Sequence, residues 1–298
     1  MDEYLFSYAA ESDTLVKRGL IRLVEKVTGQ PELKRLYIQN QRYPRPSESF
    51  WQAAVRSLAL DVRYDAAALA RVPRTGPVVF VANHPYGVLD GIVISWLVEK
   101  VRPDFAVLTN AVLMRAPEVR NFVLPVDFSE TPEAVRTNIA SRAAARARLD
   151  AGGVVVVFPA GGVSTAPDRL GRKPATDARW QPFVSQLIQR SEATVVPLWF
   201  GGQNSRLFQM ASHLSQTLRL SLIFHEVKSR IGDVLPVAIG APISFEELAV
   251  IKDRQALADE LRARAYALAA IAPKQRPKLR PAHKLLRKLS RLRPRRAA

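Results

Sequence analysis

One histidine stands where a base could act. Residues 83–91 read NHPYGVLDG and follow the apolar run PVVFVA, so His84 comes directly after a predicted buried strand. Pro85 favours an extended conformation at His84, and Gly87 permits a tight turn that can bring the Asp90 carboxylate back to the imidazole. A carboxylate on one ring nitrogen fixes the tautomer and makes the other nitrogen a better base. The pattern predicts general-base chemistry, with a helix N-cap at Asp90 and a loop role for His84 as the alternative.

The sequence shows no rival catalytic machinery. It has no cysteine, which excludes disulfides, thiolate metal sites and a cysteine nucleophile. Ser164 lies in GGVSTA, where Ala166 stands in place of the last glycine of a nucleophile elbow. There is no P-loop, no G-x-G-x-x-G after a strand and no histidine pair at metal-ligand spacing, so we expect no metal and no cofactor. His213 and His225 carry no motif and are interpreted as structural or surface residues.

The elements that must position His84 read as an α/β domain. Runs such as GVVVVFP are apolar at every position, which is typical of strands buried on both faces of a largely parallel sheet. The sequence predicts a mixed sheet of about seven strands flanked by helices. Since ligands bind beyond the carboxyl ends of such strands, NHPYG and FPAGG are expected at one edge. The predicted strands are 77–83, 104–109, 122–127, 153–159, 194–200, 220–225 and 235–239, and the predicted helices are 91–101, 131–150, 180–190, 205–218 and 253–270.

Composition divides the chain into three parts. Residues 1–72 predict a helical region packed on the core, with one helix entered through Ser47 or Ser49. Residues 73–272 form the α/β domain, in which the polar stretch 164–179 has the length of a functional loop. Residues 273–298 form a basic tail. No apolar run approaches the ~20 residues that span a bilayer, and the start of the chain has no basic n-region, so we expect no signal peptide.

Four motif blocks resemble the glycerophospholipid (lysophospholipid) acyltransferase superfamily, which includes 1-acylglycerol-3-phosphate acyltransferases, and its bacterial hemolysin-like branch. The blocks are NHPYGVLDG, the NAVLMRAPEVRNF stretch with Arg115, FPAGG, and VVPL at 195–198. In that superfamily they correspond to H-x4-D, an arginine block, F-P-E-G-T-R-S and V-P-hydrophobic. The resemblance spans roughly residues 75–200 in the same order.

The resemblance implies an O-acyltransferase. His84 would take the proton from the hydroxyl of a lysophospholipid such as 1-acylglycerol-3-phosphate, with Asp90 orienting the imidazole. That hydroxyl would attack acyl-CoA or acyl-carrier protein with no covalent enzyme intermediate. The acyl thioester is a co-substrate, so no cofactor is implied. The substrate-binding residues carried over are Asn83, Arg115, Phe158, Pro159, Gly161, Gly162 and Ser164.

Two departures from the family pattern bear on the substrate. Five residues rather than four separate His84 from Asp90, as in the resembled branch. In the third block Ala160 replaces the glutamate and GVS replaces T-R-S, so both charged side chains are absent. An acceptor without phosphorus, such as lyso-ornithine lipid, is therefore one alternative, and a non-catalytic lipid-binding protein on this fold is another.

Several roles in these blocks stay open. Gly161 and Gly162 can bring bare backbone close to a head group or an oxyanion, or form a plain strand-end turn. Arg115 would hold an acceptor or donor anion, unless it is merely solvated. Asn204, in GGQNS after another strand, is either a site residue or a helix cap. The other candidate cations are Arg120, Arg169, Arg172, Lys173 and Arg179.

The tail makes a separate prediction about partners. Residues 273–298 hold eleven Lys or Arg and no acid, and so contribute eleven of the seventeen net positive charges. Four leucines (285, 286, 289 and 292) share one helical face among them, a pattern typical of a helix on an anionic membrane. Nucleic-acid binding is disfavoured because the tail has no aromatic residue to stack on bases, and a solvated tail is the other alternative. We expect a cytoplasmic protein, peripheral on the inner face of the membrane.

Overall fold

The computed structural model describes residues 19, 29–111, 114, 116–127, 129 and 131–273. Within this part of the chain seven strands form one sheet in the order β1-β7-β6-β2-β5-β3-β4. All neighbouring pairs are parallel except β6 and β7, so the predicted α/β fold with a largely parallel mixed sheet is confirmed. The strands are β1 Asp61–Arg63, β2 Val78–Ala82, β3 Phe105–Asn110, β4 Val123–Val126, β5 Val154–Val157, β6 Thr194–Phe200 and β7 Val234–Ile239.

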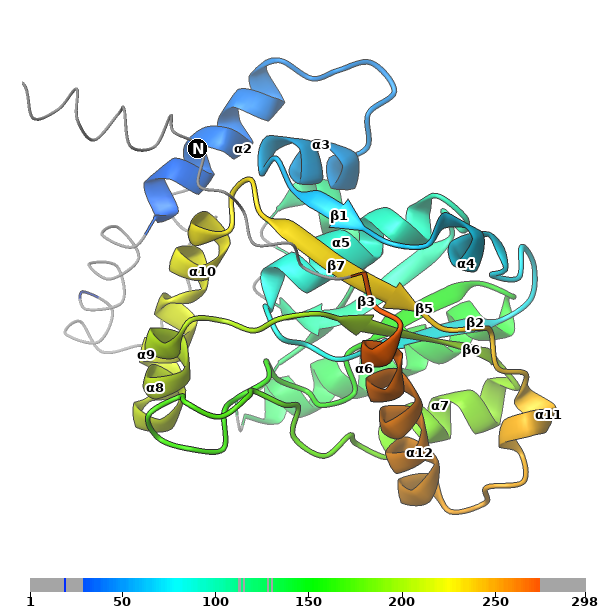
Figure 1. Cartoon of the computed structure of the whole chain (residues 1–298). Helices are drawn as coiled ribbons and strands as arrows, with labels where there is room; N and C mark the ends of the chain where they lie inside the picture. The colour runs from blue at the N-terminus through cyan, green and yellow to red at the C-terminus, as the bar shows by residue number, and fades with distance from the viewer. Residues whose placement is uncertain are drawn as a thin grey trace, which may run out of the picture.

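Helices cover both faces of this sheet because its central strands are apolar at every position. In β2, Val78 and Phe80 pack into one core, whereas Val79 and Val81 pack into a second core on the opposite face. The first core is closed by α2 Gln30–Arg42, α3 Phe50–Ser57, α4 Ala66–Ala70, α5 Val88–Glu99, η2 Pro117–Phe122, α8 Arg206–Leu214 and α10 Ile223–Ser229. The second is closed by α6 Pro132–Asp150, α7 Phe183–Ser191, α11 Phe245–Leu248 and α12 Arg254–Ala267 (Figure 1).

The region before the first long strand is only partly helical. Ser49 caps α3 by accepting a hydrogen bond from the Gln52 N–H, as the sequence predicted. Between α3 and α4, however, β1 pairs with β7 in parallel. Apolar and polar residues alternate over 60–64, and Leu60, Val62 and Tyr64 pack against the first core, but this run is short and its partner strand lies about 170 residues away in the sequence. The division into an N-terminal region 1–72, a domain 73–272 and a tail 273–298 stays a prediction.

The predicted strand 220–225 is wrong. This segment contains the end of α9 Gln216–Ser221 and the start of α10. A short apolar run fits either a strand or one face of a helix. Here Val227 follows Ile223 and Phe224 at helical spacing, and all three side chains are buried in the first core. The predicted single helix 205–218 is likewise divided at Ser215, which adopts an extended conformation and accepts from the Leu218 N–H.

The corrected segment lies at the edge of the sheet where His84 is found. β7 runs antiparallel to β6 and begins where β6 ends, with Phe200 opposite Val237. The chain between them, including α8, α9 and α10, therefore crosses the carboxyl-end edge of the parallel strands. Figure 1 shows these three helices as a yellow-green to yellow group at that end of the sheet. The helices are thus placed to border a site at the ends of β2 and β5.

Candidate functional site

The turn after β2 is shaped around a buried carboxylate. Gly87 has φ 78°, a conformation that side chains other than glycine rarely adopt, and the chain enters α5 one residue later. Asp90 lies in the first helical turn, and its Oδ2 accepts from the backbone N–H groups of Tyr86 (2.7 Å) and Gly87 (2.9 Å). Asp90 is therefore not the N-cap residue. Its side chain closes the turn from inside the helix.

This turn brings the two residues of the first block together. His84 Nδ1 lies 3.1 Å from Asp90 Oδ2, and the side chains are 17% and 0% exposed. The two atoms are close but lack the alignment of a hydrogen bond, and Asp90 Oδ1 has no hydrogen-bond partner among the described residues. With Nδ1 facing the carboxylate, Nε2 is the nitrogen left to accept a proton.

The environment of Asp90 penalises its charged form. Burial raises the pKa of this carboxyl, while the contacts with His84 and with the two backbone N–H groups of the turn act in the opposite direction. A carboxylate held in this way stabilises a positive charge that forms on the neighbouring imidazole. The pair can therefore support proton abstraction by His84.

The end of β5 supplies the surface on which the imidazole rests. The Phe158 ring stacks on His84 with centroids 4.0 Å apart and an interplanar angle of 27°. The chain then turns, with the Gly161 N–H donating to the Phe158 carbonyl at 3.0 Å and Gly161 at φ 70°. The Pro159 carbonyl accepts from the Gln181 N–H at 2.9 Å. The first and third motif blocks thus form one site, and Phe158 fixes one face of the imidazole.

Asp177 joins these two blocks, although no motif predicted it. Its Oδ1 accepts from the His84 backbone N–H at 3.1 Å and from the Ser164 hydroxyl at 2.5 Å. Its Oδ2 accepts from Trp180 Nε1 at 2.9 Å. The Ser164 N–H in turn donates to the His84 carbonyl at 2.8 Å. Ser164 is 2% exposed, so its contacts in the structure hold the loops together.

Asn83 connects the strand before His84 to its neighbour. Its amide accepts from the Phe200 N–H at 2.7 Å and donates to the Phe200 carbonyl at 3.0 Å. Tyr86 adds a second link, since its hydroxyl donates to the Gly201 carbonyl at 2.7 Å. Both ends of the Asn83 amide are used by the sheet, so a direct contact of Asn83 with substrate stays a prediction.

The arginine and lysine residues predicted as anion-binding cations have no described contact with the His84 and Phe158 loops. Arg115 lies outside the described residues. Arg120 is exposed and donates to the Met114 carbonyl at 2.9 Å, and Arg179 pairs with Asp259 at 2.5 Å. The loop carrying Arg169, Arg172 and Lys173 closes on Asp168, which accepts from the backbone N–H groups of the last two. None of these described contacts joins the His84 and Phe158 loops.

A further cation, Arg219 of α9, does reach the third block. Its Nη2 donates to the Val163 carbonyl, and its guanidinium lies 5.7 Å from the centre of the Phe208 ring. No motif pointed to Arg219, which lies between the predicted helix 205–218 and the wrongly predicted strand 220–225. Asn204 is 1% exposed and its amide has no hydrogen-bond partner among the described residues. The cap of α8 is Ser205, so Asn204 is not a helix cap.

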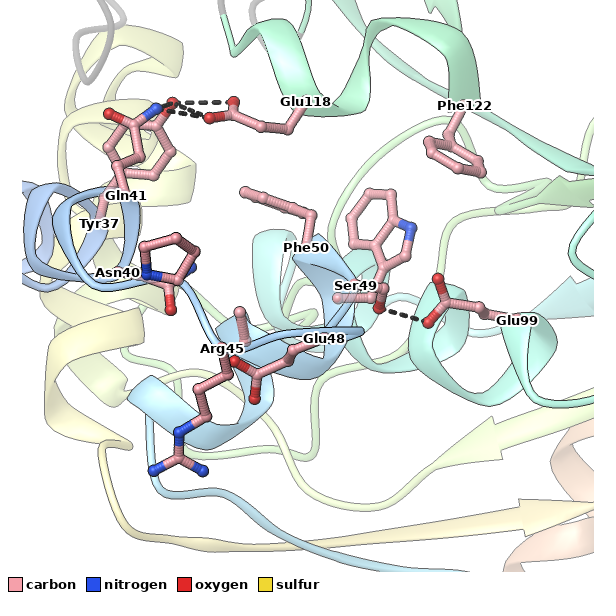
Figure 2. A pocket seen from close by; sticks show the side chains of 13 residues that line it. Tyr37, Asn40, Gln41, Arg45, Glu48, Ser49, Phe50, Glu99, Glu118 and Phe122 are labelled. Carbon is pink, nitrogen blue, oxygen red and sulfur yellow. Dashed lines mark hydrogen bonds between the residues drawn. The ribbon is translucent and has the colours of Figure 1, made fainter.

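A separate pocket of about 720 Å³ lies between α2, α3 and the far end of α5. Trp51 is one of the aromatic residues that line it, and Figure 2 shows Phe50 and Phe122 in its wall and the Glu118 carboxylate hydrogen-bonded to Tyr37. Glu99, at its rim, is the last residue of α5, whereas Asp90 is in the first turn. Nine helical residues span roughly 14 Å, so this pocket is distinct from the His84 site.

The described residues contain no acidic or histidine cluster suited to a metal ion and no helix long and apolar enough to cross a membrane.

Comparison with known proteins adds a family and named relatives. A protein-family model described as Acyltransferase matches residues 20–271. A lyso-glycine lipid O-acyltransferase of Phocaeicola vulgatus is 22% identical over 259 residues, which covers 83% of this chain and 86% of the relative. The protein of the same name from Bacteroides thetaiotaomicron is 21% identical over 259 residues, with 83% and 88% covered. The crystal structure of the 1-acyl-sn-glycerophosphate (LPA) acyltransferase PlsC from Thermotoga maritima is similar with a TM-score of 0.48 and 14% identity, covering 86% of this chain and 80% of that one.

Proposed function

Because the chain belongs to the acyltransferase family, we propose that it moves a fatty acyl group from an acyl thioester to the hydroxyl of a lyso-lipid with an amino-acid head group. The enzyme is an acyltransferase of the lyso-lipid type. The observation that carries the mechanism is the 3.1 Å contact between His84 Nδ1 and the buried Asp90 carboxylate. Two further observations support the head group. Both relatives are named for a lyso-glycine lipid, and Ala160 and Val163 replace the charged side chains of the third block.

One base, His84, both takes up and returns the proton in this reaction. His84 Nε2 takes the proton of the acceptor hydroxyl while its oxygen bonds to the thioester carbonyl carbon. The tetrahedral intermediate then collapses, the C–S bond breaks, and the departing thiolate receives the proton from the imidazolium. Asp90 stabilises the imidazolium during both steps, and Phe158 prevents the ring from turning. Base catalysis of this kind contributes roughly 10²–10⁴ in rate, and positioning supplies much of the rest.

The test is a transfer assay with the full-length protein. Labelled acyl-CoA and acyl-carrier protein are each offered with lyso-glycine lipid, lyso-ornithine lipid and 1-acylglycerol-3-phosphate. We expect the highest kcat/KM with an amino-acid acceptor and a loss of at least about 10²-fold in His84→Ala, because the base is removed. Circular dichroism and the thermal midpoint check that the variant is folded.

Each other outcome has a definite meaning. A preference for 1-acylglycerol-3-phosphate would overturn the head group but retain the chemistry. Near-normal turnover in folded His84→Ala would overturn the mechanism. Transfer to no acceptor from either donor, combined with binding to lipid vesicles, would favour a lipid-binding protein on this fold.

A further inference from the structure

The positive charge of the Arg219 guanidinium is not neutralised by a carboxylate of the described residues. Its guanidinium donates to the Val163 carbonyl and faces the Phe208 ring, but it makes no ion pair with any carboxylate of the described residues. Burial lowers the pKa of Arg219, which reports the cost of removing this cation from water. An arginine stays protonated under such conditions, so the cost is offset when an anion binds to it.

The described residues leave space beside this guanidinium, next to Gly162. A Cβ atom added at Gly162 would meet only Arg219 Nη2, at 3.8 Å, and one added at Gly161 would meet nothing within 4 Å. Gly161 needs its positive φ of 70°, but Gly162 has no such requirement. Glycine at 162 is therefore explained neither by backbone conformation nor by packing. In addition, no described residue accepts a hydrogen bond from the Gly162 N–H, so the exposed loop offers a free donor beside the half-buried guanidinium of Arg219.

This loop is fastened directly to the base. Val163, which Arg219 contacts, immediately precedes Ser164, whose N–H donates to the His84 carbonyl at 2.8 Å. The Val163 side chain also lies 3.1 Å from the position of a Cβ at Gly87, in the turn that holds Asp90. An anion on Arg219 would therefore lie next to the loop that carries the catalytic histidine.

We propose that Arg219 and the Gly162 N–H bind the anionic group of the acceptor head group, a carboxylate or a phosphate, and so orient the acceptor hydroxyl toward His84. This rests on the acyl transfer proposed above. The acceptor is the source of the anion because its head group and its reacting hydroxyl are a few bonds apart. In the thioester donor the pantetheine arm separates the phosphates from the reacting carbon. A planar guanidinium matches either oxyanion with two parallel hydrogen bonds.

The experiment compares a charged acceptor with its neutral form. KM and kcat are measured for lyso-glycine lipid and for its methyl ester, and likewise for 1-acylglycerol-3-phosphate and monoacylglycerol. Arg219→Gln removes the charge but keeps a polar side chain with an N–H donor. We expect its KM to rise at least tenfold for the charged acceptors and by less than twofold for the neutral ones, with donor KM unchanged. Arg219→Lys should recover part of the loss.

Two further variants distinguish an anion bound at Arg219 from the loss of any positive charge nearby. Arg206→Gln removes an exposed charge on the neighbouring helix α8 and should leave both acceptors unchanged. Gly162→Val puts a side chain beside Arg219 at a position where an added Cβ meets no other described atom within 4 Å, and it should raise the same acceptor KM in a protein with a normal thermal midpoint.

The proposal is overturned in three ways. Arg219→Gln could lower kcat/KM equally for charged and neutral acceptors, which would make Arg219 structural. The donor KM could rise instead, which would place the donor phosphates at Arg219. Arg206→Gln could match Arg219→Gln, which would indicate long-range attraction alone. These outcomes all require a wild-type protein that transfers acyl groups, whereas absence of transfer in the wild type contradicts the proposed function itself.

Discussion

The carboxylate of Asp177 lies 3.1 Å from the backbone nitrogen of His84 and holds the loop that carries this proposed base. The same carboxylate accepts from the Ser164 hydroxyl and from Trp180 Nε1. Its main chain is fixed as well, because the Asp177 N–H donates to the Tyr266 hydroxyl at 2.8 Å. One buried acidic residue from the long polar loop therefore sets the distance between the two strand-end loops of the site.

Asp177→Asn should lower both stability and activity. The asparagine amide has one acceptor atom and one donor group in place of two acceptor oxygens. It therefore cannot accept from the His84 N–H, the Ser164 hydroxyl and Trp180 Nε1 together, and one of these donors is left buried without a partner. The loss is expected at about 1–3 kcal/mol of unfolding free energy. We also expect a reduced kcat with little change in KM, since His84 shifts while the binding groups remain.

The control for Asp177→Asn comes from the same loop. Asp168 is more exposed and bonds only to backbone N–H groups of its own turn, so Asp168→Asn should change kcat by less than twofold. Denaturant unfolding and steady-state kinetics measure both effects. If the two variants behave alike, Asp177 does not position the base.

Asp90→Asn should raise the folding stability of the protein while it lowers the activity. Burial raises the pKa of this carboxyl, so the folded protein holds the proton more tightly than the unfolded chain. Above that raised pKa the ionised carboxylate therefore reduces folding stability, and a neutral amide removes this penalty. The amide oxygen can still accept from the Tyr86 and Gly87 N–H groups.

The measurement for Asp90→Asn is the free energy of unfolding against pH, together with kcat. Relative to wild type, the variant should gain stability as pH rises through the raised pKa and show no gain at acid pH. Its kcat should fall by at least about 10²-fold, because the imidazolium loses its counter-charge. A folded variant with near-normal kcat would show that Asp90 does not assist His84.

Much of this fold could be predicted because its strands are short, apolar and buried on both faces. The runs at 78–82, 154–157 and 194–200 favour central strands because they are rich in valine and almost wholly apolar, and the structure places them next to each other. The run at 220–225 was ambiguous, because its apolar residues also suit one face of a helix. β1 was missed because its apolar–polar alternation covers only residues 60–64, and its partner β7 is about 170 residues away in the sequence.

The contacts of the candidate site likewise divide into those that the sequence predicted and those that it did not. Pro85 and Gly87 predicted a turn between His84 and Asp90, and the structure places the two side chains 3.1 Å apart. Local sequence can specify such a contact. Asp177 and Arg219 could not be predicted, because they reach the site from a long loop and from a misassigned helix. Their roles depend on tertiary contacts with residues 13 to 93 positions away, which no spacing rule encodes.

Gly87→Ala should disturb the site from within the turn. Alanine rarely adopts φ 78°, and its Cβ would lie 3.1 Å from Val163 and 3.2 Å from Ile223. The strain should cost about 1–3 kcal/mol and lower kcat, since the turn aligns His84 with Asp90. Gly91→Ala is the matched control. That glycine lies inside α5 with nothing within 4 Å of an added Cβ, so alanine should stabilise the protein by about 0.5–1 kcal/mol. Thermal unfolding compares them, and equal effects would contradict the role of the turn.

Deleting residues 273–298 tests the membrane contact, which lies almost wholly outside the described residues and stays a prediction of the sequence. The deletion removes eleven positive charges and the four-leucine face together, but none of the loops around His84. Each basic residue near an anionic surface contributes roughly 1 kcal/mol before screening, so binding to anionic vesicles should fall sharply. Full-length binding should weaken with salt, because exposed charges are screened beyond a ~10 Å Debye length at 0.1 M.

The truncated protein should stay folded and turn over soluble, short-chain substrates at a similar rate, because the chemistry is left in place. Changing only the four leucines to serine should leave a weaker and more salt-sensitive association, since the charges remain while the apolar face is lost. Cosedimentation with vesicles, at several salt concentrations, compares the three proteins. Binding that is unchanged on truncation would move the membrane contact away from the tail, and the N-terminal segment with Leu20, Leu23 and Val24 would be the next to alter.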